Sequence, residues 1–486
     1  MAKAEYVTKG NFIFNTETQS RMRLKCLNWY GAHQETFVPG GLEVRNIPDL
    51  VDSIVSTEAN CVRLTFSVHM VIYNPKVEAQ FTAGVQGKDC NFTTTYALDV
   101  LACVIYYLQR ANILIILNNH NSFPSWVGPG EVIKQGFWND NTYSTEMWIR
   151  SLEELAIRFR VFGFDLRNEI HDQNQKIITW GASDDINTDW LAASSLAAER
   201  LLKIDPDVMI IVGGMCWNLD MRPMIKLVGP KIAKDRKKLI YTAHMYDWSF
   251  WWRTDLKAFH SLFMCSLVLS VFCYVMMLYG IKKQSEFSKY EKFEEDQNTV
   301  YDSVMLALAC SFVFHFLWLV LILLFILLVQ ENGCSTLAYD AENCLSLALG
   351  YAVLTFFFLW FVKRDVMQFF IWFSFWAGCF FASVLGILIY LEMDVAHVRF
   401  LRAWWKLDDS VVPIFWGEFG KSIGQENHIF SLLKSTLLDD YKLDFAYWAF
   451  NGKKYFNGMW YNESFGIMNE DYKTFKDKNF TLSLFH

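Results

Sequence analysis

The sequence has little charge and no surplus of basic residues. Only 20% of its 486 residues are charged, and 44 Lys and Arg against 51 Asp and Glu give a formal net charge of −7. Proteins that bind nucleic acid usually carry a basic surplus, so no nucleic-acid partner is expected. The 11 Cys show no zinc-type spacing. The chain is instead 53% hydrophobic and 17% aromatic, which excludes disorder and places part of it in a deep core or in lipid.

The apolar excess is concentrated in four runs that contain no Asp, Glu, Lys or Arg: 259–281, 304–329, 345–362 and 366–391. Each is long enough to cross a hydrocarbon core of about 30 Å as a helix. Buried core helices are the alternative, but such helices rarely stay apolar on every face. We therefore expect three segments: 1–257, a transmembrane insert of four helices at 258–394, and 395–486. An even number of spans leaves both flanking segments on one side of the membrane, where they can form one domain.

The links between the runs predict sidedness. The link 330–344 has no Lys or Arg, whereas the links 282–303 and 363–365 carry several. The positive-inside rule then predicts a multi-pass integral membrane protein with its flanking domain extracellular or lumenal. Cys334 and Cys344 could form a disulfide in that setting. The expected partners include the lipid bilayer and membrane proteins that pack against the four helices.

The flanking segments alternate short β-branched runs with amphipathic stretches, which is typical of a parallel sheet with crossover helices. The predicted strands are 24–29, 61–66, 113–117, 162–166, 208–212, 239–243, 414–417 and 445–450. Eight such units predict the α/β class and a (β/α)8 TIM barrel, interrupted between strands six and seven by the transmembrane bundle. The segment 12–23 could be a hairpin that closes the bottom of this barrel.

Polar and aromatic residues follow the predicted strands at the end where such barrels carry their active sites. They are Arg63, His120, Asn168, Glu169, His244, Tyr246, Glu418 and Trp448. Glu169 and Glu418 come from strands four and seven and would face each other across the barrel. A carboxylate pair is what glycoside hydrolysis requires, and a flat aromatic ring can stack on the apolar face of a sugar. The alternative is two unrelated structural carboxylates.

Six motifs carry a resemblance to a known family. They are LNWYG at 27–31, LNNH at 117–120, GFDLRNEIHD at 163–172, YTAHMY at 241–246, PIFWGEFG at 413–420 and YWAFNG at 447–452. In this order they resemble glycoside hydrolase family 5, most closely its cellulase-like endo-β-1,4-glucanases of bacterial type. The stretch LAAERLLKIDPDVMIIVGG at 196–214 adds to the likeness. The resemblance covers nearly all of 1–257 and 395–486 and none of the insert.

The resemblance implies a retaining enzyme that needs neither metal nor cofactor, with Glu169 as acid/base and Glu418 as nucleophile. The carboxyl groups would lie about 5–5.5 Å apart, and Glu169 would have a raised pKa. Substrate-binding and positioning roles are implied for Arg63, His120, Asn168, His244, Tyr246 and Trp448. Among these, Asn168 would bond the sugar 2-hydroxyl, and Trp448 would form the floor of the sugar site. The one departure is Ile170, where the family usually has Pro.

Further Trp residues follow strands and could be sugar-stacking positions: Trp126, Trp138, Trp180, Trp217, Trp248, Trp251 and Trp252. The last three precede the first apolar run, so an interfacial aromatic belt is at least as good an interpretation. The leading hypothesis is a membrane-anchored β-glycoside hydrolase acting on β-glucan. One alternative is a glycosidase directed at glycolipid headgroups such as glycosylceramides. Another is a structural or sugar-binding subunit of a membrane complex.

Overall fold

The computed structural model describes residues 5–85, 90, 96–126, 135–173, 176–246, 405, 407 and 410–485. These residues belong to one compact unit that comprises Met1–Ser249 and Val398–His486. The predicted insert at 258–394, with its four apolar runs and with Cys334 and Cys344, lies outside the described residues. The predicted boundaries of the three segments therefore stay a prediction.

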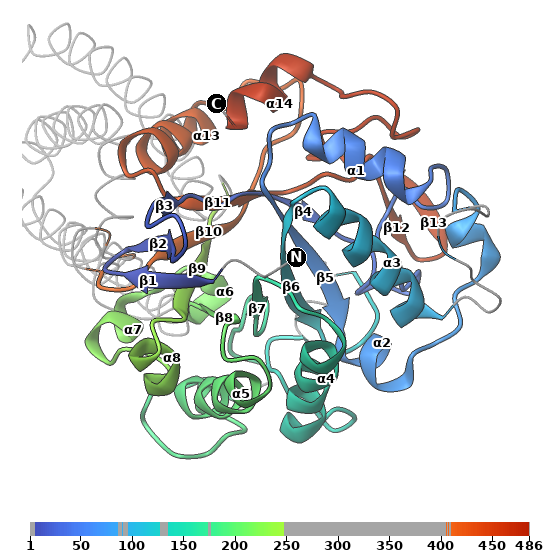
Figure 1. Cartoon of the computed structure of the whole chain (residues 1–486). Coiled ribbons are helices and arrows are strands. Elements are labelled where there is room, and N and C mark those ends of the chain that lie inside the picture. Colours follow the sequence, from blue (N-terminus) through green and yellow to red (C-terminus); the bar gives the residue numbers. More distant parts are fainter. Residues whose placement is uncertain are drawn as a thin grey trace, which may run out of the picture. The chain divides into compact units, whose positions relative to one another are not determined.

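Eight parallel strands form a closed barrel in the order β10-β11-β4-β5-β6-β7-β8-β9 (Figure 1). They are β4 Lys25–Trp29, β5 Cys61–Ser67, β6 Leu114–Asn121, β7 Gly163–Asp165, β8 Met209–Gly213, β9 Leu239–His244, β10 Ile414–Phe419 and β11 Asp444–Tyr447. Each corresponds to one of the eight predicted strands, so the (β/α)8 barrel is confirmed. Nearly every strand residue is buried, as expected of a parallel sheet that helices cover on its outer side.

The barrel is built from two parts of the chain that are far apart in the sequence. β9 and β10 pair directly, with Ile414 beside Tyr241 and Glu418 beside His244. β11 closes the barrel against β4. The chain therefore leaves the barrel at the carboxyl end of its sixth strand, β9, and the seventh strand, β10, begins at Ile414.

Helices cover the outside of the barrel (Figure 1). The longer ones are α1 Ile47–Val55, α2 Val68–Tyr73, α3 Ala97–Arg110, α4 Thr145–Arg158, α5 Trp190–Ile204, α13 His428–Lys434 and α14 Lys478–Phe485. Side-chain caps begin several of them: Ser144 accepts from the Met147 amide at α4, and Asp189 accepts from the Ala192 amide at α5. Such caps satisfy amides that have no partner inside the helix. Shorter elements complete the fold: η1 Ala79–Thr82, α6 Met215–Asn218, α7 Arg222–Lys226, α8 Lys231–Asp235, η5 Ser435–Asp440, β12 Lys453–Phe456 and β13 Met459–Asn462.

A small antiparallel sheet closes the amino-terminal end of the barrel. It consists of β1 Tyr6–Lys9, β2 Phe12–Asn15 and β3 Arg21–Met22. Tyr6 and Ile13 pack into the core cluster that also holds Cys26 and Phe162 from the barrel interior. The predicted hairpin is thus present, with a third strand before it.

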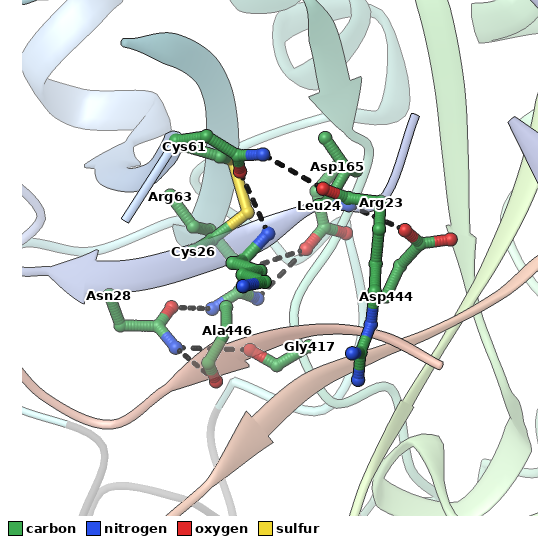
Figure 2. Close-up of a disulfide and its surroundings, with 12 residues drawn as sticks. Arg23, Leu24, Cys26, Asn28, Cys61, Arg63, Asp165, Gly417, Asp444 and Ala446 are labelled. Atoms are coloured by element: carbon green, nitrogen blue, oxygen red, sulfur yellow. Dashed lines mark hydrogen bonds and ion pairs between the residues drawn. A yellow bond between two sulfur atoms is a disulfide. The ribbon is translucent and has the colours of Figure 1, made fainter. Parts of the chain in front are cut away.

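A disulfide that was not anticipated joins Cys26 of β4 to Cys61 of β5, two directly paired residues inside this core cluster (Figure 2). A second disulfide joins Cys90 to Cys103. Closing the 35-residue separation between Cys26 and Cys61 restricts the unfolded chain. We expect the double variant Cys26→Ala/Cys61→Ala to lose about 3–4 kcal/mol of unfolding free energy, measured by chemical denaturation. Reduced wild type also loses the Cys90–Cys103 bond and should be destabilised at least as much, and equal stability of reduced and oxidised wild type would contradict the prediction.

Within the described ranges no helix is long and apolar enough to cross a membrane. The longest of these helices, α5, has 15 residues, whereas a span needs about 20. The prediction of a multi-pass integral membrane protein with an extracellular or lumenal barrel is therefore wrong as far as the described residues reach. The described residues give no support to a lipid bilayer or a membrane protein as a partner.

Candidate active site

Arg63 is the centre of a buried polar network at the carboxyl end of the barrel. Its side chain is fully buried and its Nη1 donates to Glu418 Oε1 at 2.6 Å and to Asn28 Oδ1 at 2.8 Å. Its Nε donates to Asp165 Oδ2 at 2.8 Å, and its Nη2 donates to Asn168 Oδ1 at 2.9 Å. Five donors in a rigid fork allow one guanidinium to hold four side chains, which come from β4, β7, β10 and the segment just after β7. Arg63 thereby fixes the position of Glu418.

Glu169 and Glu418 lie on either side of His244. The His244 Nδ1 atom is 2.9 Å from Glu169 Oε1 and 3.8 Å from Glu418 Oε2. The Tyr246 hydroxyl donates to Glu418 Oε2 at 3.2 Å. One carboxylate oxygen of each Glu and one His244 nitrogen all lie within 4.8 Å of one another. This spacing fits the retaining arrangement and is shorter than the 6.5–9.5 Å typical of inverting enzymes.

The two carboxyl groups differ in what surrounds them. Burial raises the pKa of Glu169 to about 7, and the nearby Arg63 charge opposes this only in part. Burial also raises the pKa of Glu418, but the charge of Arg63, which is bonded directly to this carboxyl group, opposes the rise. Glu418 therefore ionises first, and Glu169 holds the proton near neutral pH. Burial lowers the pKa of His244 to about 4, so its ring is neutral there.

Trp448 lies at the end of the eighth strand in a cluster of rings. Its ring stacks on Tyr30 at 4.8 Å with an interplanar angle of 1°, and on His120 at 5.6 Å and 19°. Trp126 meets it edge-on at 6.3 Å. The His120 Nδ1 atom pairs with Asn118 Oδ1 at 2.9 Å. These contacts hold the Trp448 ring in place, and 8% of the residue stays exposed.

All eight residues predicted for the site meet at this end of the barrel. Ile170 is fully buried, and its carbonyl accepts from the Trp217 amide at 2.8 Å, so the residue in place of the family's Pro has a structural role. Among the other predicted stacking positions, Trp138 is fully buried and cannot contact a sugar. Trp248, Trp251 and Trp252 lie outside the described residues.

Sequence reasoning missed two members of the Arg63 network, Asn28 and Asp165 (Figure 2). Asn28 Nδ2 donates to the carbonyls of Gly417 and Ala446, which ties β4 to the seventh and eighth strands. Both residues lie inside quoted motifs, LNWYG and GFDLRNEIHD, and both face the barrel interior. A polar residue inside an otherwise apolar buried strand is the signal that would have found them.

Among the described residues, Glu169, His244 and Glu418 are also the group whose donor atoms lie close enough to hold a metal ion. Arg63 lies 2.6 Å from Glu418 and already supplies a positive charge there. A divalent cation would have to sit next to that guanidinium, which like-charge repulsion disfavours. The set fits a pair of reacting carboxyl groups better than a metal centre.

This protein is a parallel (β/α)8 barrel, and two carboxyl groups lie close together at the carboxyl end of its strands. These two features place it in the class of barrel enzymes with paired acidic residues. The family model described as "Cellulase (glycosyl hydrolase family 5)" matches residues 19–264. The chain therefore belongs to glycosyl hydrolase family 5, as the motifs indicated.

Individual relatives agree with this membership. A "Glycosyl hydrolase 5 family protein" from Chamaecyparis obtusa is 29% identical over 269 residues, covering 51% of this chain and 45% of that protein. An "Endoglucanase" from Paenibacillus polymyxa is 26% identical, covering 45% of this chain and 51% of its own length. The chain thus spans about half the length of these relatives. The solved catalytic domain of the major endoglucanase from Xanthomonas campestris pv. campestris has a TM-score of 0.57 at 15% identity, with 99% of each chain covered, which supports the fold.

Proposed function

We propose that this protein is a retaining β-glycoside hydrolase that cleaves β-linked glucans, with Glu169 as acid/base and Glu418 as nucleophile. The observation that carries the proposal is the pair of carboxyl groups within 4.8 Å, of which Glu418 is bound to Arg63 and Glu169 is not. One group is thereby suited to remain an anion and the other to keep its proton. A double displacement needs both states at once.

In the first step an oxygen of Glu418 attacks the anomeric carbon while Glu169 gives its proton to the departing glycosidic oxygen. A covalent bond forms between Glu418 and the sugar, and the bond to the leaving group breaks. Because the charge on Glu418 is consumed, the pKa of Glu169 falls and it becomes a base. It then takes a proton from water, which attacks the same carbon and releases Glu418. Two inversions at one carbon give net retention.

The surrounding residues suit a sugar in this position. The Trp448 ring can stack on the apolar face of the sugar next to the cleaved bond. Asn168 accepts from Arg63 at 2.9 Å through its Oδ1 atom, and its Nδ2 would donate to the sugar 2-hydroxyl. The endoglucanase names of the relatives favour a β-glucan as substrate. The glycolipid and structural alternatives rested on the apolar insert, and no contact among the described residues favours either one.

The product's stereochemistry tests this function. The full chain is incubated with cellopentaose, and the anomeric protons are followed by NMR from the first minutes. We expect the β-anomer of the new reducing end to appear first, before mutarotation. Release of the α-anomer first would contradict the double displacement. No hydrolysis of any β-glucan oligomer would contradict the function itself.

The pH dependence of the rate follows from the pKa of Glu169. The acid must be protonated, so kcat/KM should fall as pH rises through about 7. The measurement is a pH–rate profile with a cello-oligosaccharide. A 2,4-dinitrophenyl cellobioside provides the control, because its leaving group departs without a proton. With this substrate, the rate of forming the covalent intermediate should not fall at high pH. If both substrates show the same basic limb, Glu169 is not the acid.

A further inference from the structure

A second group of aromatic rings lies at the carboxyl end of the barrel and takes no part in the proposed reaction. Phe37 follows β4, His69 and Tyr73 belong to α2 after β5, and Phe123 follows β6. Tyr73 is 55% exposed and Phe123 is 47% exposed. We call these four residues the rim surface. Since they follow the carboxyl ends of three neighbouring strands, they share the face of the barrel that carries Glu169 and Glu418.

His69 holds the rim surface together. Its ring stacks on Phe37 at 5.8 Å and 19°, and on Phe123 at 6.5 Å and 27°, and it lies 4.7 Å from Tyr73. Its Nδ1 atom pairs with the Tyr143 hydroxyl at 2.7 Å, which fixes the ring. Burial lowers the pKa of His69, so the ring is uncharged near neutral pH. The rings therefore form a preorganised uncharged group, although two of them are half exposed to water.

The rim surface continues from the sugar floor at Trp448. Phe123 and Trp126 both belong to the segment that follows β6, and Trp126 packs edge-on against both Trp448 and Tyr30, at 6.3 and 5.2 Å. The His69 amide donates to the carbonyl of Ser122 at 3.1 Å, which ties α2 to this loop. The segment after β6 thus carries one ring of the rim surface, Phe123, and one ring of the Trp448 cluster, Trp126.

Exposed flat rings suit a sugar chain better than they suit water. The faces of a β-linked glucose unit present C–H groups that stack on aromatic rings, while its hydroxyls stay hydrated at the edge. We propose that the rim surface binds distal sugar units of the same β-glucan chain whose bond is cleaved between Glu169 and Glu418. The substrate class rests on the proposed function. The site itself rests on the arrangement of the rings.

Sugar binding by a protein variant that cannot cleave its ligand tests the rim surface without relying on turnover. The full chain with Glu418→Gln is titrated calorimetrically with cellobiose and with cellohexaose, alone and combined with Tyr73→Ala/Phe123→Ala. We expect the added pair to weaken cellohexaose binding by about tenfold, since two stacking contacts are lost. Cellobiose binding should change much less. The matched control is Tyr106→Ala, which removes a 49% exposed ring from α3 on the side of the barrel.

The two sugars distinguish a lost binding site from a structural defect. A loss that grows with chain length supports the rim surface. An equal loss for both sugars means a general structural defect and overturns it, as does unchanged cellohexaose binding. Sedimentation of the same variants shows whether the rings instead hold two copies together, which would also overturn the proposal. If wild type cleaves no β-glucan but the length-dependent loss remains, the proposed function fails while the rim surface stands.

Discussion

Replacing Glu418 with Gln is expected to lower kcat on cello-oligosaccharides by about 10⁴-fold or more. The amide keeps the shape of the carboxylate and can still accept from Arg63, but it has no charge and cannot form the covalent intermediate. The measurement is the steady-state rate beside a denaturation curve. Glu43→Gln is the control, since Glu43 is a shielded carboxylate paired with Lys453 at 3.2 Å, outside the site.

Rescue by azide separates the roles of the two carboxylates. In Glu418→Ala the small anion can attack the anomeric carbon directly, and one displacement gives a glycosyl azide of inverted configuration. In Glu169→Ala, with an activated leaving group, azide should replace water in the second step and give the retained configuration. If the two variants yield azides of the same configuration, or neither is rescued, the assignment of nucleophile and acid/base is wrong.

Replacing Arg63 with Met is expected to lower stability by about 3–5 kcal/mol, because Asp165 loses its guanidinium partner while remaining fully buried. The rate should fall by about 10²–10³-fold, since Glu418 loses its strongest hydrogen bond. Arg63 lowers the pKa of Glu418. Its removal should therefore raise that pKa and move the acidic limb of kcat/KM to higher pH. Denaturation and pH–rate profiles measure the two effects.

Arg200 provides the matched control for Arg63. It also bonds two carboxylates, Glu146 at 2.7 Å and Glu153 at 2.5 Å, but on the outer surface of the barrel. Ion pairs of that kind contribute about 0–1 kcal/mol, so Arg200→Met should change stability little. Similar losses of unfolding free energy for Arg63→Met and Arg200→Met would show that burial does not make the Arg63 network more stabilising than a surface ion pair.

Much of the fold could be predicted because local patterns and barrel topology agree. The eight β-branched runs fold as the eight barrel strands, since their side chains can only be buried on both sides of a parallel sheet. The site could be predicted for a related reason. A polar residue just after a barrel strand lies at one end of the molecule whatever its distance along the chain. Glu169 and Glu418 thus meet although they lie 418 − 169 = 249 positions apart in the sequence.

The membrane prediction followed a correct reading of composition but concerned residues beyond the described barrel. A membrane span requires a single helix that is both long and apolar. The described helices are short, and the barrel covers one side of each. Asn28, Asp165 and the Cys26–Cys61 disulfide escaped prediction for another reason. Their importance depends on which strands become neighbours, and spacing along the chain does not contain that information.

From the sequence alone, the eight alternating β-branched runs predicted the barrel, and the order of six motifs predicted the family and the pair of carboxyl residues. Those features depend on residue type and on position relative to strand ends. Only the tertiary structure decided that Arg63 bonds Glu418 and not Glu169, which sets the two carboxyl groups apart. It also decided that four rings, which follow three different strands, form the rim surface. Both depend on distances between side chains far apart in the sequence, which packing of the complete barrel determines.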